Sequence, residues 1–378
     1  MTFLSLARLS LRQRERLTGA MFLLVVFGGF LGAEFAYRLA TGGMFGSDGG
    51  GDVERAEAFM WDEAADLRMP RPNAEMGRIT INSLGFRGPE LAPEKTAGAL
   101  RVAFMGSSTT FDPYAPPGRT WPEQVIQRWR AAAGACRLEG VNAGVPGFTT
   151  GALRRYWSAR VAAIAPDLVF VMVSDINRDL DAYVRDRGIA SDAHFEPSWL
   201  ARNFELWRQI ELNATVIRRQ RQAFEERGKV GAVDYDALTR GYEARLGQLI
   251  EAIRADGATP VLITPQGRLR RHQSRDDQVA ASVTNLLYMP YLSIPELLDV
   301  QAVYLAALRE VAREHDVVLL DVRGAVPGDA AHFVDSSHYT PAGSSVMAAA
   351  VVDALAASQT VWRRLGAPYA ACRLEPSA

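Results

Sequence analysis

The 378-residue sequence has only two cysteines, Cys136 and Cys372, far apart along the chain. Two cysteines cannot build a disulfide-rich scaffold, and their spacing matches no zinc-binding pattern. Two interpretations are open. The pair forms one disulfide in an oxidising compartment and fastens the C-terminal end to the domain, or the two residues are unrelated buried thiols. The disulfide is our working hypothesis, the sequence supports both interpretations equally, and a count of free thiols in denatured, unreduced protein distinguishes the two.

The chain also lacks an excess of charge of either sign. It has 42 Lys and Arg against 43 Asp and Glu, a formal net charge of -1. Binding to nucleic acid phosphates normally requires a basic surface, so we expect no nucleic-acid partner. Histidine is scarce, with five residues. Because His194, His272 and His315 follow no ligand pattern, we predict no metal and no other cofactor, and the absence of Gly-x-x-x-x-Gly-Lys excludes a P-loop.

An uncharged apolar run from Leu17 to Ala33 lies near the N-terminus. It is about long enough to cross a bilayer if the flanking side chains reach the interface. Arginines precede the run and acidic residues follow it, so the positive-inside rule places the N-terminus in the cytoplasm. We therefore predict a basic cytoplasmic segment at 1–16 and a transmembrane anchor at 17–40. The alternative is a cleaved signal peptide, although no clear small-x-small cleavage site follows.

Composition divides the rest of the chain into three parts. Residues 41–77 begin with a glycine-rich stretch, and we predict a flexible linker. Residues 78–360 form the predicted main domain, with a helical insertion at about 180–233 over the strand ends. Residues 361–378 are the predicted C-terminal tail.

Apolar strand signals alternate with helical signals through this domain. The five strands are predicted near 101–106, 138–144, 166–174, 259–264 and 317–321. Alternation of this kind predicts an α/β fold, in which helices cover both faces of a parallel sheet.

The first of these strands ends abruptly at Gly106, Ser107 and Ser108. A serine at the carboxyl end of a parallel strand lies beside free backbone amides, where such sheets place their ligands. This position suits a nucleophile, and Ser108 is our candidate.

A second polar stretch, Phe333 to Gly343, places Asp335 three residues before His338. A neutral imidazole accepts a proton from serine only if an acceptor holds its other nitrogen, and Asp335 is within reach in a bent loop. Thr340 is the predicted N-cap of a following helix and Pro341 its first residue. Taken alone, the stretch is explained equally well by a turn-capping Asp and a surface His; the upstream serine favours catalysis.

Together the two stretches resemble the SGNH (GDSL-type) hydrolase family, whose first block is Gly-Asp-Ser and whose last is Asp-x-x-His. Ser107 stands here in place of the family's Asp. The segment Asn82 to Arg87 resembles the Asn-x-x-Gly-Phe-Arg that precedes the first block in many bacterial members. The resemblance implies a flavodoxin-like three-layer α/β/α sandwich and a serine hydrolase in which Ser108 attacks, His338 takes its proton and Asp335 orients the imidazole.

The resemblance also implies an oxyanion hole formed by the backbone amides of Ser108 and Gly147 and by a third donor. The family's third block is Gly-x-Asn-Asp, whereas this chain has Ser174-Asp175-Ile176-Asn177. Either Asn177 serves or Asp175 stands in. Because an ionised carboxylate would repel a developing oxyanion, we predict Asn177. The alternative is a hole with backbone donors alone, or a degenerate site.

The predicted activity is hydrolysis of O-acetyl or other short acyl esters on an envelope or exported carbohydrate, by a single-pass inner-membrane protein whose domain faces the periplasm or the cell exterior. Alternatives are an acyltransferase to a polysaccharide hydroxyl, a lipase or lysophospholipase, and a membrane-anchored binding or scaffold domain. The α/β-hydrolase pattern Gly-x-Ser-x-Gly is excluded because Thr110 replaces its second glycine. The basic loop Arg268 to Arg275 is a candidate contact for an acidic or phosphorylated substrate, or a plain exposed loop.

Overall fold

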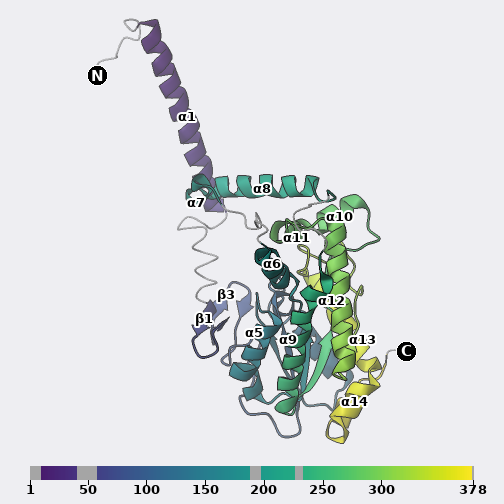
Figure 1. Cartoon of the computed structure of the whole chain (residues 1–378). Coiled ribbons are helices and arrows are strands. Elements are labelled where there is room, and N and C mark those ends of the chain that lie inside the picture. Colours follow the sequence, from purple (N-terminus) through teal and green to yellow (C-terminus); the bar gives the residue numbers. More distant parts are fainter. Residues whose placement is uncertain (1–9, 41–57, 188–196, 226–232, 377–378) are drawn as a thin grey trace. The chain divides into compact units, whose positions relative to one another are not determined.

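The computed structural model describes residues 10–40, 58–187, 197–225 and 233–376 (Figure 1). The chain divides into two compact units. The small unit comprises residues 1–55 and 195–215, and the sheet unit comprises residues 56–194 and 216–378.

The small unit contains a long helix, α1 (Leu11–Ala40), with α7 (Trp199–Asn203) and the first part of α8 (Glu205–Arg221). Within α1, Thr18–Tyr37 is long and apolar enough to cross a membrane, with a mean hydropathy of 1.8. A signal sequence meets the same criterion, so the helix is established and its crossing of a membrane stays a prediction.

The sheet unit is built on five parallel strands: β5 (Leu100–Gly106), β6 (Leu138–Gly144), β7 (Leu168–Met172), β8 (Thr259–Ile263) and β9 (Val318–Leu320). Their order in the sheet is β6-β5-β7-β8-β9. Counted along the chain from β5, this order is 2-1-3-4-5, the flavodoxin-like arrangement. The predicted fold class is therefore confirmed.

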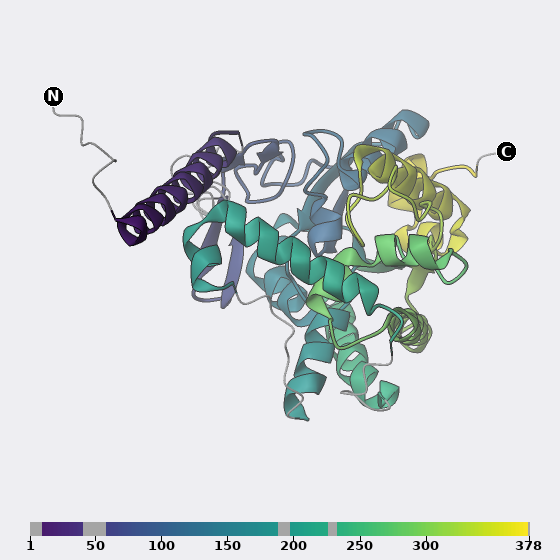
Figure 2. The same cartoon turned by 90° about the horizontal axis from the view of Figure 1, so that it is seen from above.

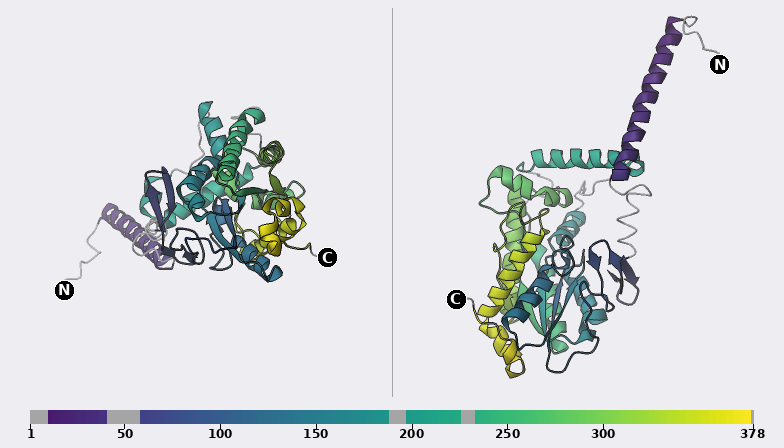
Figure 3. Two further views of the ribbon diagram at one scale, coloured as in Figure 1. Left: turned by 90° about the horizontal axis from the view of Figure 1, so that it is seen from below. Right: turned by 180° about the vertical axis from the view of Figure 1, so that it is seen from behind.

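Helices cover both faces of the sheet (Figures 2 and 3). One face carries α5 (Thr150–Tyr156), α9 (Tyr235–Ala255) and α12 (Ile294–Glu314); the other carries α4 (Trp121–Ala132), α13 (Pro341–Ala357) and α14 (Gln359–Leu365). Successive residues of β5 alternate between the two cores: Ala103 and Met105 face the first layer, and Val102 and Phe104 the second. The sheet unit is thus a three-layer α/β/α sandwich.

Capping fixes where the loops around the sheet end. Helices α4 and α12 each begin with a capping box, at Thr120 and Ser293. Helix α13 begins as predicted, with the Thr340 side chain accepting from the Gly343 N–H and Pro341 in the first turn. The shorter helices are α3 (Ser108–Phe111), α6 (Ile176–Asp186), α10 (Arg275–Ala281) and α11 (Val283–Tyr288).

The predicted flexible linker at 41–77 is wrong from residue 58 onward. Strand β1 (Phe59–Asp62) pairs with β2 (Leu67–Pro70), and β3 (Glu75–Met76) pairs with β4 (Ile79–Thr80), both antiparallel. Leu67 and Met69 are buried in the core of the sheet unit, so this hairpin is held by tertiary packing. Residues 41–57 lie outside the described part of the chain.

The predicted insertion at 180–233 is helical where the structure describes it, but it does not belong to one unit. Residues 195–215, including α7 and the start of α8, group with α1 in the small unit. Residues 188–196 and 226–232 are outside the described ranges.

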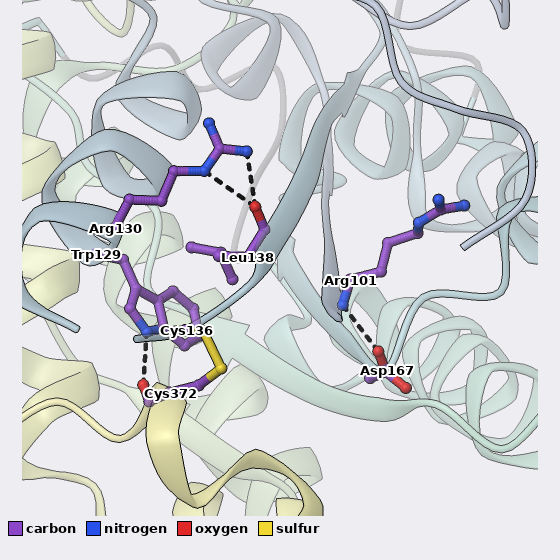
Figure 4. The surroundings of a disulfide bond; sticks show 7 residues. All are labelled: Arg101, Trp129, Arg130, Cys136, Leu138, Asp167 and Cys372. Atoms are coloured by element: carbon purple, nitrogen blue, oxygen red, sulfur yellow. Dashed lines mark hydrogen bonds between the residues drawn. A yellow bond between two sulfur atoms is a disulfide. The ribbon is translucent and has the colours of Figure 1, made fainter. Parts of the chain in front are cut away.

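The segment predicted as the C-terminal tail, 361–378, packs into the sheet unit where the structure describes it. Val361 and Leu374 are buried against α4 and α13. Cys136 and Cys372 form a disulfide (Figure 4), and the Trp129 Nε1–H donates to the Cys372 carbonyl at 2.7 Å. Of the two interpretations of the cysteines, the structure contains the disulfide.

Replacing both cysteines by serine should lower the free energy of unfolding by about 2–5 kcal/mol, because the bridge closes a loop of 236 residues and limits the unfolded chain. Urea unfolding of the full chain in detergent, with and without reductant, measures this. Reductant should destabilise the wild type and leave the Cys136→Ser, Cys372→Ser variant unchanged. Equal midpoints for oxidised and reduced wild type would contradict it.

Candidate active site

Ser108 lies at the carboxyl edge of the sheet, directly after β5. The neighbours of β5 are β6 and β7, reached by crossovers on opposite faces, so Ser108 sits at the topological switch point. The turn requires glycine: a Cβ on Gly106 would lie 2.1 Å from Thr110 Oγ1 and 2.4 Å from the Met172 carbonyl oxygen. Gly106 therefore lets α3 fold back tightly, and Ser108 becomes its first residue.

The second predicted stretch forms a closed loop at the same edge. An antiparallel bridge between Phe333 and Tyr339 joins its ends. Within it, Asp335 Oδ1 accepts the backbone N–H groups of Ser337 and His338, both at 2.8 Å. This turn leaves Oδ2 free to meet the imidazole, and it lies 2.7 Å from His338 Nδ1.

The imidazole also reaches the serine. His338 Nε2 lies 2.8 Å from Ser108 Oγ, although 230 residues separate the two in sequence. The ring of Tyr114 packs edge-on against the imidazole, with centroids 5.9 Å apart. The structure thus brings Ser108, His338 and Asp335 into one chain of hydrogen bonds, while their catalytic roles stay predictions.

Two opposing effects act on the Asp335 carboxyl. Burial favours its neutral form, but the hydrogen bond and charge of His338, with the two backbone N–H groups, favour the carboxylate. The hydrogen bonds and the charge of His338 together outweigh burial, so the pKa of Asp335 lies below its ordinary value. Asp335 is therefore an ionised acceptor for the His338 Nδ1–H throughout the neutral pH range.

A cavity of about 480 Å³ opens beside Ser108, and Gly147 and Asn177 also line it. Gly147 has φ +80° and lies in the turn that follows β6. Within the described part of the chain, the backbone N–H groups of Ser108 and Gly147 donate no hydrogen bond. The side-chain amide of Asn177 has no hydrogen-bond partner there either. The three residues of the predicted oxyanion hole thus line one cavity.

Asp175 lines this cavity too, but its carboxylate is engaged elsewhere. Oδ1 accepts from the Thr150 N–H at 2.8 Å and from its hydroxyl at 3.0 Å, and Oδ2 pairs with Arg245 at 2.8 Å. Arg245 also pairs with Asp179 at 2.7 Å. Because Asp175 holds α5, α6 and α9 together, the structure does not favour the alternative in which it replaces the amide.

Two arginines of the basic loop Arg268 to Arg275 are engaged within the protein, and a contact of this loop with an acidic substrate stays a hypothesis. Arg270 donates to the Gly267 and Val326 carbonyls, and Arg271 pairs with Asp299 at 2.7 Å. Neither arginine lines the cavity, whose cations are Arg178 and Arg323.

Sequence reasoning assigned no role to two buried residues that brace the segment after the serine, although Arg87 belongs to the recognised motif Asn82 to Arg87. Arg87 donates to the carbonyls of Phe111, Asp112 and Ala115, and its burial lowers the pKa of the guanidinium to about 10. Asp112 adopts φ +61°, a conformation that Asp and Asn tolerate. Its Oδ2 accepts from the Trp121 N–H at 2.9 Å and the Ser344 hydroxyl at 2.7 Å. The sequence did contain a signal for the role of Arg87, because it is a single arginine at the end of a largely apolar turn.

Burial raises the pKa of Asp112 to about 6, so the folded state holds its proton more tightly than the unfolded chain. The stability gained from this proton is fully present below about pH 4 and is lost as pH rises through 6, at a cost of about 3 kcal/mol. Asp112→Asn should remove this cost and keep both hydrogen bonds. Urea unfolding of both proteins between about pH 4.5 and 7.5 should show the variant gaining relative to wild type; parallel curves would contradict it.

Comparison with known proteins supports the family to which the sequence motifs pointed. The family model described as GDSL-like Lipase/Acylhydrolase family matches residues 104–346. Among solved structures, an acetylxylan esterase from Geobacillus stearothermophilus is 19% identical, with TM-score 0.39 and coverage of 71% of this chain and 94% of that one. An alpha/beta hydrolase enzyme from the metagenome of Lake Arreo, Spain, is 20% identical, with TM-score 0.41 and coverage of 69% and 96%. These two likenesses carry no argument about substrate. No curated protein sequence matches. The family match spans more than half of the chain, which therefore belongs to the GDSL-like (SGNH) lipase and acylhydrolase family and is an ester-hydrolysing enzyme.

Proposed function

We propose that this enzyme hydrolyses short acyl esters, O-acetyl groups above all, through a triad of Ser108, His338 and Asp335. The observation that carries the proposal is the 2.8 Å contact between Ser108 Oγ and His338 Nε2, with the Asp335 carboxylate 2.7 Å from the other ring nitrogen. This is the order of donor and acceptor that serine hydrolysis requires.

In the proposed reaction the Ser108 oxygen attacks the ester carbonyl carbon as its proton passes to His338 Nε2. The N–H groups of Ser108 and Gly147 and the Asn177 amide stabilise the oxyanion. The protonated imidazole then gives its proton to the leaving alcohol as the acyl–oxygen bond breaks. Water, deprotonated by His338, attacks the acyl-serine and regenerates the free hydroxyl while the acid leaves.

Asn177→Ala should lower kcat by about 10²–10³-fold with a smaller effect on KM, because the amide donates only to the charged intermediate. Steady-state kinetics on an aryl acetate tests this. Arg185→Ala, at an exposed residue of α6 that does not line the cavity, is the matched control and should change kcat by only a few fold. An unchanged kcat for Asn177→Ala would show that the oxyanion hole consists of backbone donors alone.

The proposed location is the inner membrane, with α1 as an uncleaved single-pass anchor and the sheet unit in the periplasm. The disulfide supports an oxidising compartment outside the cytoplasm. Acyl groups on envelope or exported carbohydrate are the esters that such a location offers, and the substrate proposal rests on this location.

Turnover of a series of aryl esters from acetate to palmitate by the full chain in detergent tests the acyl preference, with Ser108→Ala as the blank. We expect the highest kcat/KM for acetate. A preference for long chains would replace the carbohydrate proposal by a lipase or lysophospholipase. If acyl groups appear on an added oligosaccharide faster than free acid is released, the acyltransferase alternative is correct.

A further inference from the structure

Glu34 is a buried acid within the apolar stretch of α1. It is 5% exposed, and its two carboxylate oxygens accept the backbone N–H groups of Glu205 and Leu206 at 2.8 and 2.7 Å. These are the first two residues of α8, so Glu34 caps that helix. A carboxylate at a helix N-terminus is stabilised by the unpaired N–H groups and the helix dipole. The acid therefore faces a protein partner and not lipid.

Aromatic packing fixes the same junction. Phe30, one turn before Glu34 on the same side of α1, packs edge-on against Phe204 at 5.3 Å and Trp207 at 6.2 Å. The α7–α8 connection is thus attached to the last turns of α1 by rings and by hydrogen bonds. Figure 1 shows the start of α8 running across the C-terminal end of α1.

The position of Glu34 along α1 determines the depth at which α8 begins. Glu34 lies three residues before Tyr37, where the apolar stretch ends, which is about 4.5 Å along the helix axis. If α1 spans a membrane, α8 begins where the hydrocarbon meets the headgroups. Capping by Glu34 satisfies the N–H groups that a helix end in this region would otherwise leave unpaired.

The exposed residues of α7 and of the first part of α8 include side chains of the kinds found where the hydrocarbon meets the headgroups. Trp199 is 70% exposed, Leu200 39% and Ile210 48%, and Arg202 is exposed beside them. Large apolar side chains exposed on two consecutive helices mark a candidate interaction surface. Tryptophan favours the bilayer interface, and arginine extends its charge to lipid phosphates there. We define Trp199, Leu200, Arg202 and Ile210 as the interfacial patch.

We propose that the interfacial patch lies in the headgroup layer of an anionic phospholipid membrane, so that α7 and α8 form a second attachment beside α1. The inference rests on the proposed anchoring of α1. It gives the insertion a role in membrane attachment, separate from ester hydrolysis at the sheet. It also predicts that α8 stays in contact with the bilayer throughout turnover.

The test places an environment-sensitive NBD dye at Ile210→Cys in the full chain, reconstituted into vesicles of phosphatidylcholine and phosphatidylglycerol. The two native cysteines are joined in the disulfide, so unreduced wild type should take up no dye and serves as the blank. Val25→Cys, 72% exposed in the middle of the apolar stretch, is the deep reference. Nitroxide lipids labelled at the headgroup or deep in the acyl chain, and aqueous iodide, report the depth of each dye.

We expect headgroup nitroxides to quench the dye at 210 strongly and deep nitroxides to quench the dye at 25, with iodide ineffective at both. Quenching at 210 should weaken in pure phosphatidylcholine and in high salt. Full access of iodide to 210 with deep quenching at 25 would overturn the patch and leave the anchor. Protection from iodide without lipid quenching would identify a protein neighbour and overturn it too. Loss of lipid quenching at 25 would remove the anchor, and the patch with it.

Discussion

Ser108→Ala is expected to lower kcat for an aryl acetate by about 10⁴-fold or more while the protein stays folded. The change removes only the hydroxyl that lies 2.8 Å from His338 Nε2. It leaves the helix start, the N–H group and the tight turn at Gly106 intact, so the loss reports chemistry and not packing. The full chain in detergent, assayed by release of the aryl alcohol, gives kcat directly.

Ser107→Ala is the matched control for this prediction. Ser107 is the neighbouring hydroxyl, lines the same cavity and is the N-cap residue of α3, but its side chain makes no capping bond and none to His338. Its replacement should cost no more than a few fold in kcat. If Ser107→Ala is inactive and Ser108→Ala retains turnover, the assignment of the nucleophile is wrong.

Asp335→Asn should also lower kcat by about 10⁴-fold, with the loop unchanged. The Asn Oδ1 can still accept the N–H groups of Ser337 and His338. Its amide would donate to His338 Nδ1, which forces the ring proton onto Nε2. An imidazole protonated at Nε2 cannot take the proton of Ser108. A variant that keeps a tenth of the wild-type kcat would show that Asp335 does not hold the tautomer.

The same substitution has a signature in stability. Because the pKa of Asp335 is lower in the folded protein, its carboxylate stabilises the fold above about pH 4, and this contribution is lost as pH falls through the folded value. Asp335→Asn should remove that dependence. Acid unfolding curves of the two proteins should therefore converge at low pH and separate toward neutrality.

The five parallel strands could be predicted from the sequence because each lies in a short apolar run followed by a polar turn, and alternation with helices implies a parallel sheet. Their flavodoxin-like arrangement was expected only from the family resemblance. The β1–β2 hairpin could not be predicted. Its strands have four residues each, include charged side chains, and are held by burial of Leu67 and Met69 under the core. Such strands depend on long-range packing that no local pattern records.

The meeting of Ser108 and His338 was predictable because each lies in a short motif at the edge of an element. The surroundings were not, since they join distant segments: Arg245 reaches Asp175 across 70 residues. A local signal existed, because Arg245 stands between Tyr242 and Leu246, both buried on the inner face of α9. A cation at such a position indicates an acidic partner on a neighbouring element, but the sequence does not identify that partner as Asp175.

Covalent labelling by a fluorophosphonate, mapped by peptide mass spectrometry, tests the central proposal most directly. It requires only an activated serine, whatever the natural ester. We predict one adduct, on Ser108, formed by the wild type and lost or greatly slowed in His338→Ala. An adduct on any other residue, no adduct at all, or labelling of Ser108 at an equal rate in His338→Ala would contradict the account.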